Sequence, residues 1–259
     1  MIWSQTPQSP HGTLIGAVIC YNGILLSTDS RGSFTATDAL TLKETQYAYV
    51  DSLQKIFKIG SYHMAISGST NVGNTYWSSL IAQFNASIKA GLTVEQTFDQ
   101  FIRFLLEKKQ IPDSVFTSSY FITVGYEGNL PVIIGTNGHP KSRTSTPTDR
   151  IFSMPCIKNE LQRLSAEAFK TEIVFLSLRT GYSSCSLGDK TIGGPVEILQ
   201  ITNGNKVKKL QNYKFRSFIN YEQFKKAISK KQIKVEYTIP DAHLLLQRFV
   251  ISQPAMPDY

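Results

Sequence analysis

The sequence contains few cysteines and no membrane-length apolar run near its N-terminus, which argues against two classes of protein. Three cysteines among 259 residues suggest no disulfide framework, so a reducing compartment is expected. The apolar run Leu14–Cys20 is far shorter than the roughly 20 residues that cross a bilayer. Residues 1–12 contain two prolines, several polar residues and no basic segment, so we expect no signal peptide. A cytoplasmic protein without a membrane anchor is therefore predicted.

Metal ligands and nucleotide-binding loops are also lacking. The four histidines and three cysteines show no metal-ligand spacing. The sequence has no GxGxxG segment and no phosphate-binding P-loop. We therefore expect neither a cofactor nor a metal ion. Cys156 offers a thiol nucleophile, although a buried structural role is commoner for such a cysteine.

Acidic residues are scarce in one segment, where the positive charge is concentrated. Residues 205–235 hold ten basic residues and a single acidic one, Glu222, whereas the whole chain has a net charge of +8. A solvated basic face is the ordinary interpretation; binding of nucleic acid, anionic lipid or an acidic partner is the alternative. Aromatic residues interleave with the lysines, which fits base stacking and equally fits a helix that packs on the main body. These residues are Tyr213, Phe215, Phe218, Tyr221 and Phe224. Nucleic acid and membranes are not the expected partners.

Short apolar runs around glycine turns predict two β-hairpins in the first third of the chain. An Asn-Gly pair at residues 22–23 favours a tight hairpin turn. The paired runs are residues 14–20 with 24–28, and residues 55–59 with 62–67. Residues 31–50 are polar and rich in threonine, so a loop is predicted between the hairpins.

The later part of the chain alternates blocks of helices with pairs of strands. Apolar residues recur at helical spacing in residues 74–90 and 93–109, and Thr93 stands at an N-cap position. The other predicted elements are strands at 120–126, 130–136 and 151–153, a loop at 137–149, a helix at 157–177 that is broken near Lys170, a hairpin of 196–202 with 207–210, a helix near 221–230 and an apolar run at 243–251. This order is typical of an α+β fold with antiparallel sheets. We expect a leader at 1–12, one domain at 13–210 and a basic C-terminal extension at 211–259.

Thr13 stands at the junction between this leader and the first predicted strand, directly after Gly12. If the bond between them is cut, Thr13 carries a hydroxyl nucleophile together with a free α-amine that serves as its base. Gly12 presents no side chain that would obstruct attack on its carbonyl. A strand threonine that follows a loop glycine is the ordinary alternative.

The segments TLIGAVICYNGILLSTDSRGS, QKIFKI and MAISGST together closely resemble the β subunits of proteasomes, which are N-terminal-nucleophile hydrolases. The resemblance covers about residues 12–210 and is most specific in its first third. It implies a four-layer αββα sandwich of two antiparallel sheets flanked by helices. It also implies autocatalytic cleavage at Gly12-Thr13 and threonine-type endopeptidase activity on protein or peptide substrates. A homo-oligomeric ring, and an ATPase regulator as a further partner, are implied as well.

The resemblance assigns roles to the residues of the predicted hairpins. Thr13 is implied to be the nucleophile, and Lys55 to supply an ammonium that stabilises charge on its oxygen. Asp29 is implied to be the counter-charge that a buried ammonium needs. Gly68, at the end of the second hairpin, is implied to hold the oxyanion through its N–H.

Further positions carry weaker implications or depart from the family pattern. Ser33 is implied to orient substrate or a bridging water, and Asp189 to hydrogen-bond near the α-amine; a turn aspartate is the alternative for Asp189. Ile192 replaces the serine of the family's late Asp-x-x-Ser-Gly segment. Cys156 or Ser153 stands where the family usually has Gly-Ser-Gly. These departures favour the alternative function, a non-catalytic ring subunit or scaffold.

Overall fold

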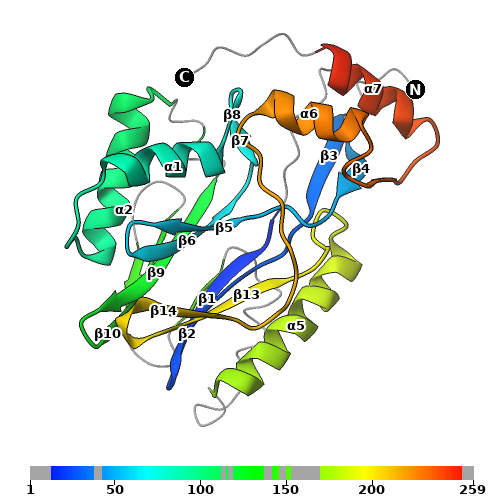
Figure 1. Cartoon of the computed structure of the whole chain (residues 1–259). Coiled ribbons are helices and arrows are strands. Elements are labelled where there is room, and N and C mark those ends of the chain that lie inside the picture. Colours follow the sequence, from blue (N-terminus) through cyan, green and yellow to red (C-terminus); the bar gives the residue numbers. More distant parts are fainter. Residues whose placement is uncertain are drawn as a thin grey trace.

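The computed structural model describes residues 13–37, 43–111, 115, 119–136, 142–145, 150–152 and 170–252. Two larger antiparallel sheets dominate this part of the chain, and helices lie on their outer sides (Figure 1). The first sheet has the strand order β12-β1-β2-β13-β14 and the second has the order β11-β10-β9-β6-β5. The predicted α+β class with antiparallel sheets is therefore confirmed.

The strands of these two sheets agree closely with the apolar runs of the sequence. The first sheet contains β1 (Ile15–Cys20), β2 (Gly23–Thr28), β12 (Arg150–Phe152), β13 (Glu197–Thr202) and β14 (Lys206–Lys209). The second contains β5 (Ile56–Ile59), β6 (Tyr62–Ser67), β9 (Tyr120–Glu127), β10 (Leu130–Thr136) and β11 (Ser142–Thr144). Both predicted hairpins of the first third are confirmed, with full pairing of β1 to β2 and of β5 to β6. β11 lies within the stretch that was predicted as a loop.

Strands β1 and β2 are buried throughout and mostly apolar, because both of their faces are covered. Alternate residues such as Ile15, Ala17 and Leu26 pack between the two larger sheets. Their neighbours Leu14, Val18 and Leu25 face the opposite way and pack against α5 (Thr171–Gly188). The two sheets therefore meet face to face, and α5 covers the outer side of the first.

The second sheet is covered by the helices predicted at residues 74–90 and 93–109. These are α1 (Trp77–Ser87) and α2 (Val94–Arg103), which continues into a π-helical turn, η1 (Phe104–Lys108). Thr93 caps α2 as predicted, because its side chain accepts a hydrogen bond from the Gln96 N–H and the Gln96 side chain bonds back to the Thr93 N–H. Aromatic and aliphatic residues of both helices form one cluster with β6, β9 and β10.

The predicted loop at residues 31–50 is wrong. Strands β3 (Gly32–Thr37) and β4 (Glu44–Val50) pair there, with residues 38–42 outside the described part, and β15 (Val235–Tyr237) extends the sheet. Thr37 and Thr45 are partly exposed near the strand ends, whereas Thr35 is buried and Phe34 and Tyr47 are fully buried. A short hairpin of β7 (Asn71–Val72) and β8 (Thr75–Tyr76) was also not predicted.

The C-terminal residues supply the surface that covers β3 and β4. Helices α6 (Tyr221–Ser229) and α7 (Ala242–Ser252) pack there, in one cluster with Phe34 and Tyr47. Phe218, Tyr221 and Phe224 are at most 8% exposed. Because base stacking needs an accessible ring, these three aromatics fit the helix-packing interpretation.

Helix α5 extends further toward the C-terminus than predicted and begins near the break expected at Lys170. The stretch 157–169 of that predicted helix lies outside the described residues. Glycine and serine in the second half of α5 disfavour helix locally, but Tyr182 and Cys185 are buried there against the first sheet. Cys185 is disulfide-bonded, which the cysteine count did not lead us to expect, whereas Cys20 is a free, buried thiol.

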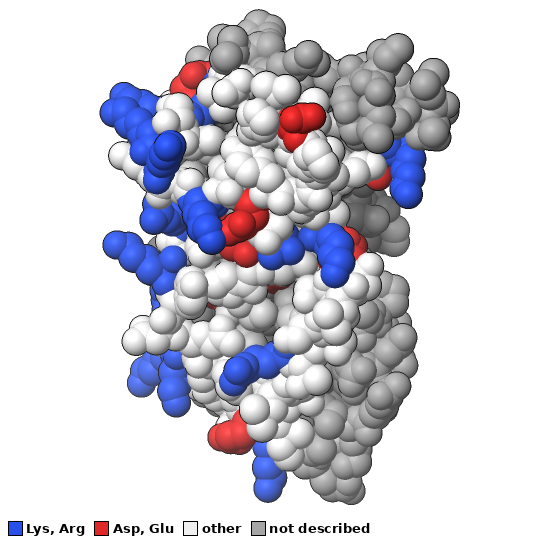
Figure 2. Space-filling view, turned by 90° about the vertical axis from the view of Figure 1, so that its right-hand side faces the viewer, with Lys and Arg blue, Asp and Glu red and all other residues white. Residues whose placement is uncertain are grey.

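The basic residues lie mostly on the outside of the elements that carry them. β14 is an edge strand whose four residues, Lys206–Lys209, are all exposed, and lysines on such an edge oppose pairing with another chain. Figure 2 shows lysine and arginine side chains along one side of the molecular face in view, with uncharged residues between them. None of the helices in the described residues is long and apolar enough to cross a membrane. A short 3-10 turn, η3 (Asn203–Asn205), links β13 to β14.

Candidate active site around Thr13

The carboxylate of Asp29 is the centre of the candidate site. Asp29 directly follows β2 and is 0% exposed. Its Oδ1 accepts hydrogen bonds from the Leu14 N–H at 2.9 Å and from Lys55 Nζ at 3.2 Å. Its Oδ2 accepts from the N–H groups of Arg31 at 3.2 Å and Gly193 at 3.1 Å. Four donors around one carboxylate make up much of the solvation that it loses on burial.

Lys55 lies just before β5 and points into the same buried region. It is only 4% exposed, and its ammonium also donates to the carbonyl oxygen of Arg31 at 2.5 Å. Burial lowers the pKa of Lys55 and raises the pKa of Asp29, while the attraction between the two charges opposes both changes. A lysine whose ammonium is destabilised by burial gives up a proton more readily than one in water.

The main chain that follows Thr13 is held from both sides. The Leu14 N–H is bonded to Asp29 Oδ1, and the Leu14 carbonyl accepts from the Asp29 N–H at 3.1 Å. The hydroxyl of Tyr182, on α5, donates to the same Leu14 carbonyl at 3.2 Å. These bonds fix the backbone of Leu14 at the start of β1, and therefore also the position of the preceding residue, Thr13.

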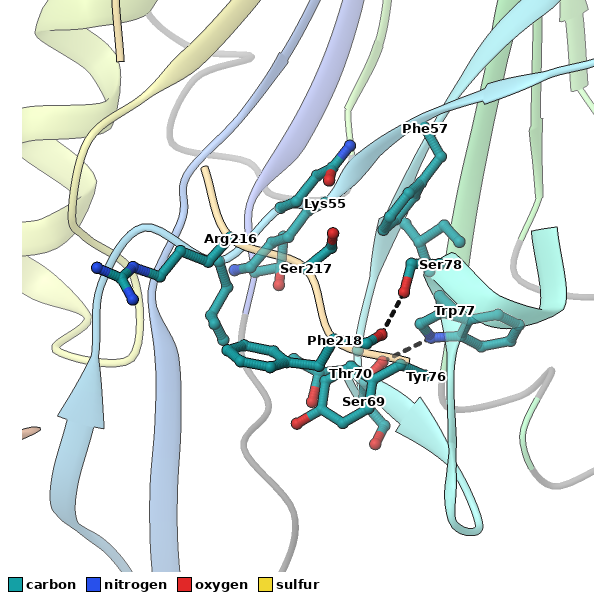
Figure 3. A pocket seen from close by; sticks show the side chains of 15 residues that line it. Lys55, Phe57, Ser69, Thr70, Tyr76, Trp77, Ser78, Arg216, Ser217 and Phe218 are labelled. Atoms are coloured by element: carbon teal, nitrogen blue, oxygen red, sulfur yellow. Dashed lines mark hydrogen bonds between the residues drawn. The ribbon is translucent and has the colours of Figure 1, made fainter. Parts of the chain in front are cut away.

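Thr13, Lys55 and Gly68 line one small cavity together. In Figure 3, Lys55 lies on one side of this cavity, and Ser69, Thr70 and Tyr76 lie on another. Gly68 follows β6 and has φ of 103°, a conformation that side chains rarely tolerate. The backbone itself therefore requires glycine at residue 68.

Ser33 and Asp189 meet at a different place, the turn around Thr191. The Ser33 hydroxyl donates to the Thr191 carbonyl at 3.1 Å and accepts from Gln46 Nε2 at 2.8 Å. Asp189, at the C-terminal end of α5, accepts from the Thr191 N–H and hydroxyl through one oxygen. These bonds make Asp189 a turn aspartate, which was the alternative interpretation. Residues 189–193 reach Asp29 through the Gly193 N–H instead.

Several residues of the site were not singled out from the sequence. Arg31 forms a two-pronged ion pair with Asp51, with nitrogen–oxygen distances of 2.9 and 3.1 Å. A side chain at Gly193 would meet the Arg31 guanidinium at 2.5 Å, so the turn approaches Arg31 closely. Tyr182 also donates to the Ser27 hydroxyl at 3.2 Å. The Gly193-Gly194 pair is a sequence signal that could have indicated a close backbone approach here.

Part of the predicted site falls on residues that the structure does not describe. Gly12, with the rest of the leader, and the alternatives Cys156 and Ser153 lie outside the described residues. Ile192, where the family pattern has serine, is 1% exposed and packs in the cluster between α5 and the first sheet. Of the predicted residues, Thr13, Lys55 and Gly68 line one cavity, and Asp29 pairs with Lys55 beside it.

Comparison with known proteins gives a match in structure alone. No protein-family model and no curated protein matches the sequence. A solved structure of Anbu from Hyphomicrobium sp. strain MC1, its Gly-1 mutant, is 14% identical with a TM-score of 0.51, over 85% of this chain and 100% of that one. A second structure of Anbu from the same strain is 14% identical with a TM-score of 0.48, over 93% of this chain and 98% of that one. The chain therefore has the proteasome-like fold of Anbu.

Proposed function

We propose that this protein is a proteasome-type, N-terminal-nucleophile hydrolase that cleaves peptide bonds with Thr13. The observation that carries the proposal is the buried Lys55–Asp29 pair, with a nitrogen–oxygen distance of 3.2 Å, at the cavity that Thr13 lines. A buried ion pair costs desolvation and is weak evidence for a stabilising role. Its place beside a hydroxyl nucleophile gives it a chemical use instead.

Processing is the first step of the proposed chemistry. The Thr13 hydroxyl attacks the Gly12 carbonyl carbon, and the peptide bond to the Thr13 nitrogen breaks as an ester to the Thr13 oxygen forms. Water then hydrolyses this ester, which releases residues 1–12 with a carboxylate end. The new α-amine of Thr13 remains beside its own hydroxyl.

Peptide hydrolysis repeats these steps on a second molecule. The α-amine takes the hydroxyl proton as the Thr13 oxygen attacks the scissile carbonyl, and the proton passes to the leaving amine. The Lys55 ammonium stabilises the negative charge that develops during attack, and Asp29 holds that ammonium in place. Water then hydrolyses the acyl-enzyme ester. The N–H of Gly68, in its constrained conformation, is the proposed donor to the oxyanion.

N-terminal sequencing together with intact-mass measurement tests this proposal. A purified chain that begins at Thr13 and gains the mass of one electrophilic threonine-protease inhibitor at that residue is the expected result. Thr13→Ala abolishes both processing and labelling, whereas Thr202→Ala, in β13, leaves both unchanged. Retention of residues 1–12 under all conditions, or a processed chain without an adduct, would contradict the enzymatic function.

A non-catalytic ring subunit is the second candidate, and two observations favour it. One carboxylate oxygen of Asp189 accepts hydrogen bonds from the Thr191 N–H and hydroxyl, at 2.9 and 2.7 Å. Ile192, buried among apolar residues, offers no hydroxyl to the α-amine. Fewer groups then remain to relay a proton to and from that amine. A processed chain that forms rings but takes no inhibitor would identify this function.

The remaining parts of the proposal concern the assembly and its place in the cell. We extend it to a four-layer αββα arrangement, to a cytoplasmic homo-oligomeric ring and to an ATPase regulator that feeds it unfolded protein. Light scattering of the purified chain measures the mass of the ring directly. A monomer at micromolar concentration would contradict the ring.

A further inference from the structure

A segment from the far end of the chain forms one wall of the cavity that Thr13 lines. Residues 216–218 belong to the link between β14 and α6, which crosses the front of the view in Figure 1. They line this cavity together with Thr13, Lys55 and Gly68. The Arg216 side chain points out of the cavity (Figure 3), and its Nη1 donates to the Gln232 carbonyl at 2.7 Å.

Backbone hydrogen bonds attach this segment on both sides of the cavity. On one side, the Gln54 N–H donates to the Arg216 carbonyl and the Arg216 N–H to the Ser52 carbonyl, both at 2.7 Å. On the other side, the Ser78 hydroxyl donates to the Phe218 carbonyl. The Tyr76 N–H donates to the carbonyl of residue 219 at 3.3 Å. Residues 216–219 are therefore a strap across the cavity, fixed at both ends.

The ring of Phe218 takes up space that the cavity would otherwise offer. It is 8% exposed and packs against Tyr76 and Phe224, with ring centroids 5.7 and 5.1 Å away. The space that remains is about 20 Å³, which is enough for about one water molecule. Apolar side chains of Phe57, Ile66 and Trp77 form much of the rest of the lining.

We infer that the strap makes Phe218 a specificity-determining residue, which restricts the substrate to small apolar side chains. This inference rests on the proposed function. The carbonyl carbon that Thr13 attacks must lie within about 3–3.5 Å of its oxygen, and the substrate side chain branches one bond away. That side chain therefore enters the cavity beside Thr13. A methyl group fits the remaining space, whereas a leucine or phenylalanine side chain overlaps Phe218.

The test compares peptide substrates that differ only in the residue whose carbonyl is attacked. Fluorogenic peptides with alanine, leucine or phenylalanine at that position are cleaved by the processed wild-type chain, and kcat/KM is measured for each. We expect a preference for alanine over phenylalanine of about tenfold or more, the range in which pockets discriminate by size. Phe218→Ala and the milder Phe218→Leu narrow or reverse this preference.

Two further variants separate cavity size from folding. Phe215→Ala removes a half-buried aromatic of the same link that does not line the cavity, so the preference should stay as in the wild type. Ser217→Leu adds bulk at an exposed residue of the lining, and we expect kcat/KM for the alanine peptide to fall about tenfold. Circular dichroism checks that each variant folds.

The outcomes distinguish this inference from the function on which it rests. Inhibitor labelling of Thr13 with equal kcat/KM for all three peptides overturns the inference and leaves the hydrolase function standing. An equal rise for all peptides in Phe218→Ala also overturns it, because the ring would then obstruct entry without selecting by size. No labelling and no cleavage overturn both.

Discussion

Replacement of Lys55 by methionine tests the energetics of the buried pair most directly. Methionine keeps most of the length and apolar character of the lysine side chain but removes its charge. The Asp29 carboxylate, 0% exposed, then loses its cation. Removal of one partner of a buried pair costs about 3–5 kcal/mol of unfolding free energy.

The environment of Asp29 places the expected cost at the lower end of that range. Three backbone N–H donors remain, from Leu14, Arg31 and Gly193, at 2.9 to 3.2 Å. They continue to solvate the carboxylate, so we expect a loss of about 3 kcal/mol. The rate of Thr13 chemistry should fall further, by about 10²–10³-fold, because the group that stabilises the developing charge is gone.

A double-mutant cycle with Asp29→Asn, followed by urea unfolding, isolates the pair. Asparagine presents an NH₂ group to two of the N–H donors, so the single variant is also destabilised. The double variant should be more stable than the sum of the single effects predicts, by about 2 kcal/mol. Lys58→Met, at an exposed lysine of β5, is the matched control and should change little. A loss below about 1 kcal/mol in Lys55→Met, or coupling near zero, would refute the reasoning.

Two further variants probe buried polar groups near the site. Glu197, on β13, is 6% exposed, and burial raises its pKa from 4.5 to about 7. As the pH rises, the unfolded chain therefore releases this proton before the folded chain does, so folding stability is lost between pH 4.5 and about 7. Glu197→Gln should remove that loss, which amounts to about 3 kcal/mol at pH 8. Glu107→Gln, at an exposed residue of η1, should not change it. An unchanged pH profile of the melting temperature in Glu197→Gln would contradict this. Tyr182→Phe removes the hydroxyl bonded to Leu14 and should cost about 0.5–1.5 kcal/mol in urea unfolding, with slower processing at Thr13; wild-type stability and processing would contradict its positioning role.

The elements that could be predicted from the sequence carry their own pattern of burial. In β1 and β2, continuous apolar runs around a tight turn indicate strands with both faces covered, and the structure has them in full register. In α2, the capping box and the apolar spacing lie within the helix itself. Such signals are local, so they are legible without knowledge of the packing partner.

Strands β3 and β4 could not be found in this way, because several of their buried positions hold glycine, serine or threonine rather than apolar side chains. Phe34 and Tyr47 are apolar positions in otherwise polar stretches, and the surface that covers them comes from helices nearly 200 residues later. The register of these strands is also broken between Phe34 and Thr35, which disturbs the alternation that a strand pattern needs.

The residues of the candidate site likewise fall into those that could be expected from the sequence and those that could not. Asp29 and Lys55 were expected at one site because the resemblance to proteasome β subunits implies it, and the structure pairs them. The contributions of Tyr182 and Gly193 could not be expected, because each depends on how α5 and the following turn dock on the first sheet. A tyrosine within a glycine- and serine-rich stretch gives no sign that its hydroxyl reaches the start of β1.

The role of the basic C-terminal residues changes how nucleic-acid binding should be tested. Deletion of residues 211–259 would expose Phe34 and Tyr47 and remove the strap, because α6 and α7 belong to the same hydrophobic cluster. Loss of binding in that deletion would follow from unfolding as readily as from loss of charge. Replacement of the exposed lysines of β14 by glutamine removes charge without touching this core. If affinity for single-stranded DNA and its decline with salt stay the same in that variant, β14 takes no part in any binding.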